Sequence, residues 1–194
     1  MNYPTKVKIE NKEYPINTDF RVAIECDNIA KSDDIGTYEK ALAIIYKLFG
    51  DKGLDDKENH EKLLELGQKY LLCGKEITDA DKKEEEDMDY IQDMDYIEAS
   101  FMSDYHIDLS QTEMHWWKFY NLLSGLSNSE MGNCCVLNRI RNLRTYDTSQ
   151  IKDIKERTKI EEAKRQVALK KKEKKLSKEQ MESVERFNKL AGIS

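Results

Sequence analysis

The chain has 194 residues, a length typical of one domain with an appendage or of two small domains. Apolar residues make up 39% of it and charged residues 36%. With this composition the chain can form a hydrophobic core only if part of it lies outside the core. Two prolines and eight glycines leave few breaks, which favours helices, and the net charge of −6 argues against a general DNA-binding protein.

The N-terminal part of the chain is expected to form a hairpin and three helices. The segment KVKIENKEYPINTDF alternates apolar and polar residues around a turn at Asn11-Lys12, a pattern typical of a small β-hairpin. Thr18 or Asp19 is expected to cap the first helix. Two more helices are predicted over residues 37–49 and 59–73, because each apolar pattern stops at a glycine.

An acidic segment follows, with eleven acidic and two basic residues between Glu76 and Glu98. It begins as an expected mobile linker and then carries the direct repeat DMDYIQDMDYI, which leads into an apolar helix. On a helix, the six-residue spacing would place Asp89 and Asp95 about 120° apart, and no glycine provides the turn of a calcium-binding loop. We therefore expect a solvated helix face and no metal site.

The segment HIDLSQTEMHWWKFYNLLSGL concentrates aromatic residues in a highly charged chain. Ser110-Gln111-Thr112-Glu113 fits a capping box, which predicts a helix from there to about Gly125. Met114 and Trp117 lie on a shoulder of that helix, which packs against the same molecule or forms a surface for a partner protein. The main apolar arc is expected to be core and comprises Trp116, Phe119, Tyr120, Leu123 and Leu126.

A second capping box, Ser127 to Glu130, precedes a helix that carries the motif NRIRNLR. Within this motif Arg141 and Arg144 share one helix face. They are candidates for binding phosphate or an acidic partner. The alternative is that they pair with the acidic segment that precedes them.

The end of the chain differs in charge from the rest. Residues 149–194 hold 14 basic and 8 acidic residues, whereas residues 1–148 hold 18 and 30. This contrast predicts an acidic, mainly helical body (1–148) and a basic helical extension (149–194). A third capping box at Ser177 opens an amphipathic segment, in which Phe187 and Leu190 are candidate anchors on another copy or on a partner.

The fold predicted from these patterns is mainly α, a helical bundle with a small N-terminal β-hairpin and a long basic C-terminal helical extension. No pattern predicts catalysis. The histidines lack metal-ligand spacing, the cysteines show no CxxC motif, and no glycine-rich phosphate loop occurs. We expect no enzyme activity, cofactor or metal. Because the sequence shows no long apolar run and no signal peptide, we expect no membrane association. We also expect a cytosolic protein whose cysteine thiols are free.

Several motifs in chain order resemble the bacteriophage "gene product fifteen" family of tailed phages and prophages of Gram-positive bacteria. They span roughly residues 5–175 and are YIEASF, DYHIDL, MHWWKF, LLSGL, NRIRNLR and KERTKIEEAKRQVALKKK. Genes of this family usually lie between those of the major tail protein and the tape measure protein. The resemblance implies a non-enzymatic tail assembly chaperone of the host cytoplasm, which binds the tape measure protein, helps to recruit major tail protein and associates with itself.

Two other functions remain open at this point. One is a structural minor tail or head–tail junction protein that is retained in the virion. The other is a phage regulator that binds nucleic acid through the basic extension, although binding of nucleic acid is not expected from a tail without interleaved aromatic residues.

Overall fold

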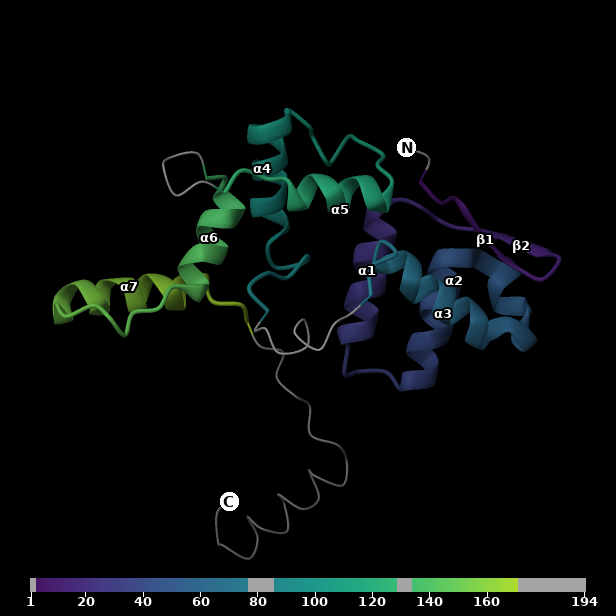
Figure 1. Cartoon of the computed structure of the whole chain (residues 1–194). Helices are drawn as coiled ribbons and strands as arrows, with labels where there is room; N and C mark the ends of the chain where they lie inside the picture. The colour runs from purple at the N-terminus through teal and green to yellow at the C-terminus, as the bar shows by residue number, and fades with distance from the viewer. Residues whose placement is uncertain (1–2, 77–85, 129–133, 171–194) are drawn as a thin grey trace, which may run out of the picture.

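The computed structural model describes residues 3–76, 86–128 and 134–170, and Figure 1 shows their arrangement. It confirms a mainly α fold with a small N-terminal hairpin. The elements of the described residues are β1 (Lys6–Ile9), β2 (Lys12–Pro15), α1 (Phe20–Lys31), α2 (Thr37–Asp55), the short 3-10 helix η1 (Lys57–Asn59), α3 (His60–Leu71), α4 (Met94–Tyr105), α5 (Trp116–Ser124), α6 (Val136–Thr145) and α7 (Ile154–Val167).

The hairpin pairs β1 with antiparallel β2. Its register places Ile9 opposite Lys12, so the turn comprises Glu10 and Asn11 and lies one residue earlier than predicted. The paired residues Val7 and Tyr14 lie on the same face of the sheet. Tyr14 is only 1% exposed, so this face of the hairpin belongs to the core.

The first three helices begin close to the predicted residues, but α2 continues to Asp55, past its predicted end at residue 49. Asp19 is the N-cap of α1, and its carboxylate accepts a hydrogen bond from the Arg21 backbone N–H at 2.9 Å. α2 is kinked at Gly50, whose φ of 64° interrupts the helical backbone where the sequence predicted an end. Gly74, with a φ of 73°, follows the end of α3.

α5 lies between the group formed by α1–α3 and the group formed by α4, α6 and α7 (Figure 1). Phe119 of α5 is completely buried. Its ring stacks on Phe20 of α1 with centroids 4.5 Å apart, and on Phe101 of α4 at 5.2 Å. These contacts join the two groups into one hydrophobic core, in which Trp116, Leu123 and Leu126 are also buried as predicted.

The predicted start of the aromatic helix at Ser110 is wrong. The helix begins at Trp116, and His115 is its N-cap. Residues 109–111 form a turn, and His115 then forms an isolated antiparallel bridge with Asp19 at the start of α1. Phe20 N–H donates to the carbonyl oxygen of Met114 at 2.9 Å, and Trp116 N–H donates to that of Thr18 at 2.7 Å.

The second predicted capping box does not start the next helix. α6 begins at Val136, and the Cys135 thiol sulfur accepts from the Asn138 backbone N–H at 3.4 Å. The acidic end of that predicted box lies outside the described residues. A helix of the predicted character therefore forms, but it starts later than the capping pattern indicated.

The extension is described as far as Lys170. α7 begins after Asp153, whose carboxylate accepts from the backbone N–H groups of Lys155 and Glu156. The helix packs on α6 and runs away from the other helices (Figure 1). The third predicted capping box, with Phe187 and Leu190, lies outside the described residues, and the division of the chain near residue 148 stays a prediction. No described helix is long and apolar enough to span a bilayer.

Asp56 fastens the hairpin to the junction between α2 and α3. Its carboxylate accepts hydrogen bonds from Lys12 Nζ at 2.6 Å, from the Tyr14 hydroxyl at 2.5 Å and from Asn59 Nδ2 at 3.1 Å. These bonds, with the one from Lys12 as the largest cause, lower the pKa of Asp56 to about 2. The hairpin is therefore held by a carboxylate that stays ionised in mild acid.

We expect Asp56→Asn to make stability less dependent on pH in acid. The folded pKa lies below the unfolded value of about 3.9, so the stabilisation is complete above that value and is lost as the pH falls through the folded pKa. The stability difference between wild type and variant should therefore shrink in acid. Urea unfolding at stepped pH measures it, with Asp55→Asn as a matched control. A difference that does not change with pH would exclude this role.

Candidate protein-binding site

The adjacent tryptophans of the HWWKF motif cap the C-terminus of α3. Trp116 Nε1 donates to the carbonyl oxygen of Leu71 at 2.9 Å, and Trp117 Nε1 donates to that of Tyr70 at 2.9 Å. The last carbonyl groups of a helix have no partner within the helix, so the Trp116 indole satisfies an acceptor that needs one at Leu71. The Tyr70 carbonyl oxygen also accepts from the Cys73 backbone N–H at 3.0 Å, so the Trp117 indole is a second donor to it. Sequence reasoning missed this role. The signal in the sequence was the pair of adjacent tryptophans, because a buried indole N–H requires a hydrogen-bond acceptor.

The shoulder formed by Met114 and Trp117 contacts the same molecule. Met114 is 4% exposed and belongs to the core, so its side chain is not part of the surface, contrary to its choice as a candidate contact for a partner. Trp117 is half-buried, and its ring stacks on Tyr70 with centroids 6.2 Å apart. Tyr3 packs against the same indole at 6.4 Å.

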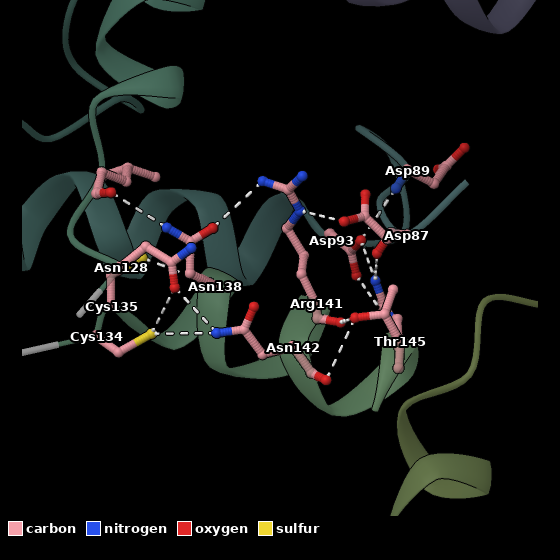
Figure 2. Close-up of polar contacts among 12 residues, drawn as sticks. Asp87, Asp89, Asp93, Asn128, Cys134, Cys135, Asn138, Arg141, Asn142 and Thr145 are labelled. Atoms are coloured by element: carbon pink, nitrogen blue, oxygen red, sulfur yellow. Dashed lines mark hydrogen bonds and ion pairs between the residues drawn. The ribbon is translucent and has the colours of Figure 1, made fainter. Parts of the chain in front are cut away.

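Arg141 and Arg144 pair with the acidic segment, which is one of the two options that the sequence left open. Arg141 Nε lies 3.0 Å from Asp87 Oδ2, and Figure 2 shows this side chain reaching both Asp87 and Asn138. Arg144 forms two hydrogen bonds of 2.7 Å to the two carboxylate oxygens of Asp93. We call these four charged residues, Arg141, Arg144, Asp87 and Asp93, the arginine hub.

The Arg144–Asp93 pair is the buried part of the hub. The side chain of Arg144 is 10% exposed and that of Asp93 is 1% exposed. The guanidinium also donates to the carbonyl oxygens of Asp87 at 2.8 Å and of Val167 at 2.6 Å. The hydrogen bonds to Asp93 raise the pKa of Arg144. Both arginines are thus used inside the molecule.

Asp93 corrects the prediction that the acidic repeat is a solvated helix face. The first copy of the repeat, residues 87–91, is not helical and enters a turn over residues 90–93, and Asp93 is the N-cap residue of α4. Its carboxylate accepts from the Asp89 backbone N–H at 3.0 Å, as Figure 2 shows. Asp89 in turn accepts from the backbone of Gln92 at 2.8 Å. These carboxylates organise the turn that leads into α4.

A second candidate site is a hollow of about 550 Å³ between α1, the end of α3 and α5, which we call the α1–α3–α5 groove. Its floor is apolar, since Ala23, Cys26 and Trp116 are each at most 4% exposed. The other residues that line it are Asp27, Ala30, Gln68, Leu71, Leu72, Lys75, Glu76, Tyr90 and Tyr120. None of the candidate residues from the sequence is among them.

The groove forms because one face of α1 carries small side chains. Ala23, Cys26 and Ala30 follow one another at helical spacing and leave room between α1 and the large rings of α5. On the opposite side, Lys75 Nζ lies 4.5 Å from the centroid of the Tyr120 ring, so a positively charged group covers this aromatic ring at the rim. The hollow is within the size range of ligand-binding pockets, about 300–1,000 Å³.

The sequence matches the family described as bacteriophage Gp15 protein over residues 2–169. The chain belongs to this family. Membership makes it a phage structural or morphogenesis protein. No curated protein and no solved structure matches it. In this Gp15-family protein the arginine hub and the groove both lie within the matched residues, whereas Phe187 and Leu190 lie beyond them.

The chemistry of the groove suits apolar contact. Burial raises the pKa of the Cys26 thiol to about 12, and it raises that of the nearby Cys73 to about 11. Both therefore remain neutral thiols at physiological pH. Among the described residues, no three His, Cys, Asp or Glu side chains are grouped so that they could hold a metal ion. An apolar floor with a charged rim is the arrangement typical of a site for a protein segment.

Proposed function

We propose that this Gp15-family protein is a tail assembly chaperone, which binds the tape measure protein in the host cytoplasm during tail morphogenesis and catalyses no reaction. The observation that carries the proposal is the α1–α3–α5 groove in a chain of this family. Recruitment of major tail protein and association between copies of the chain are further parts of the proposal. They follow from the family resemblance and not from the groove.

The apolar lining of the groove supports an α-helical client. Helix-in-groove recognition places one apolar face of an amphipathic helix against a hydrophobic surface. Ala23, Cys26 and Trp116 form the apolar floor of the groove, and Leu72, which is 37% exposed, extends the apolar surface to the rim. Long helical clients with exposed apolar stripes are prone to aggregate, so shielding such a stripe is a chaperone function.

We expect Ala30→Arg to weaken client binding. Ala30 is an exposed residue of α1 that lines the groove, so the long side chain would project into the hollow without disturbing the core. Overlapping segments of the phage's own tape measure protein are co-expressed with the chain to find those that co-purify with it. Each such segment is then titrated against the wild type and the variant to compare their affinities. Binding should fall by about tenfold or more, a loss of about 1.4 kcal/mol or more.

The matched control is Met102→Arg, which introduces the same side chain at an exposed residue of α4 away from the groove. It should bind the same segments as wild type does. Equal binding by both variants would show that the groove does not hold the client. The alternative, a component of the finished virion, is tested separately by mass spectrometry of purified particles. Abundant peptides from this chain would overturn the chaperone proposal.

A further inference from the structure

We propose that the C-terminal segment of the same chain, residues 177–194, occupies the α1–α3–α5 groove when no client is bound. This segment lies outside the described residues, and its sequence predicts an amphipathic helix. Its apolar stripe consists of Met181, Val184, Phe187, Leu190 and Ala191. The occupancy itself does not depend on the proposed function, whereas competition with the tape measure protein rests on it.

The described end of the chain is attached beside the groove. The backbone N–H of Lys170 donates to Gln92 Oε1 at 2.8 Å, and Gln92 Nε2 donates to the carbonyl oxygen of Lys170 at 3.2 Å. Tyr90, only two residues before Gln92, lines the groove. Arg144 Nε donates to the carbonyl oxygen of Val167 at 2.6 Å, three residues before Lys170, and so holds the same segment. The extension therefore leaves the body close to the opening of the groove.

The connection between the attachment point and the amphipathic segment is short. Residues 171–176 lie between the attachment point and the amphipathic segment, and six extended residues span at most about 20 Å. A short tether gives a local concentration in the millimolar range, so even a weak apolar contact becomes populated within one molecule. A second copy of the chain would need a high bulk concentration to compete.

Charge favours the same placement. The connecting residues KKEKKL are basic, whereas Asp27 and Glu76 line the groove. Glu86 lies beside them, 3.3 Å from Lys31, and its side chain remains 64% exposed. Lys31 also pairs with Asp27 at 3.1 Å, so one lysine is shared by two carboxylates at this edge. Three carboxylates (Asp27, Glu76 and Glu86) face two lysines (Lys31 and Lys75) at this edge, so its small excess of negative charge would favour the basic connection while the stripe enters the apolar hollow.

Photo-crosslinking of the full-length chain tests the proposal. Phe187 is replaced with benzoylphenylalanine, and a second protein carries the same group in place of Lys189, which lies opposite the apolar stripe at helical spacing. After irradiation, mass spectrometry should find crosslinks from position 187 to lining residues of α1 and α3, with a lower yield from position 189. Mixing isotopically light and heavy protein before irradiation separates crosslinks within one chain from crosslinks between copies.

The groove variants make the result specific. Ala30→Arg should lower the yield from position 187 by about tenfold or more, whereas Met102→Arg should leave it unchanged. Crosslinks mainly between copies, crosslinks to residues away from the groove, or a yield unaffected by Ala30→Arg would each overturn the proposal. A tape measure segment that binds should suppress the crosslink. A persistent crosslink beside a bound segment would support the occupancy and place the client elsewhere.

Discussion

Replacing Trp116 with alanine should lower the free energy of unfolding by about 3–5 kcal/mol, the range for removing a large buried aromatic side chain. Trp116 is 4% exposed, and its ring stacks on Phe119 with centroids 5.8 Å apart. Its indole N–H also donates to the carbonyl oxygen of Leu71. The substitution therefore opens a cavity between α1, α3 and α5 and removes a cap from the end of α3. Urea or thermal unfolding measures the effect.

Two further variants separate packing from capping. Trp116→Phe keeps a ring but leaves the Leu71 carbonyl without the indole donor, and loss of one hydrogen-bond partner costs about 1–3 kcal/mol. Trp117→Phe removes the equivalent bond to Tyr70 at a half-buried position, so its effect should be smaller. An unfolding midpoint of Trp116→Ala equal to that of wild type would show that Trp116 is not a core residue.

Local sequence patterns predicted the elements whose limits depend on nearby residues. The Asp19 cap of α1 and the glycines that interrupt α2 and follow α3 act on the backbone within a few residues. The helical spacing of the aromatic residues likewise identified Trp116 and Phe119 as core. In these cases the periodicity of a segment and its terminal residues contain the information that the fold uses.

The errors arose where distant parts of the chain decide the local structure. Ser110 fits a capping box, but the helix starts only at Trp116 because its backbone N–H bonds to the carbonyl of Thr18. Asp93 looked like one of many solvated acids, but its partner Arg144 lies 51 residues further along the chain. The groove could not be predicted either, because its walls come from three helices that only the folded chain brings together.

The arginine hub links the body to the extension. Arg144 of α6 binds the N-cap of α4 through Asp93 and the end of α7 through the carbonyl oxygen of Val167. Gln92, next to that N-cap, binds Lys170 through two hydrogen bonds. The buried arginine is therefore one of the groups that position the extension, together with Gln92 and the packing of α7 on α6. If residues 177–194 cover the groove, the hub also helps to fix the point on the body from which they reach it.

Arg144→Met should lower the free energy of unfolding by about 3–5 kcal/mol, because removing one member of a buried ion pair leaves an uncompensated charge on Asp93. Methionine keeps most of the apolar stem, so the lost charge dominates the effect. The matched control is Arg141→Met. The side chains of Arg141 and Asp87 are 36% and 31% exposed, and such partly exposed pairs contribute about 0–1 kcal/mol.

A double-mutant cycle with Asp93→Asn isolates the interaction. Asparagine keeps a side-chain oxygen for the Asp89 N–H but removes the charge, so the double variant should be more stable than the sum of the two single effects predicts. Hydrogen exchange of α7 gives a second measurement. Loss of the bond to the Val167 carbonyl should speed exchange in α7 for Arg144→Met but not for Arg141→Met. Additive effects, together with unchanged exchange, would show that Arg144 neither compensates Asp93 nor holds the extension.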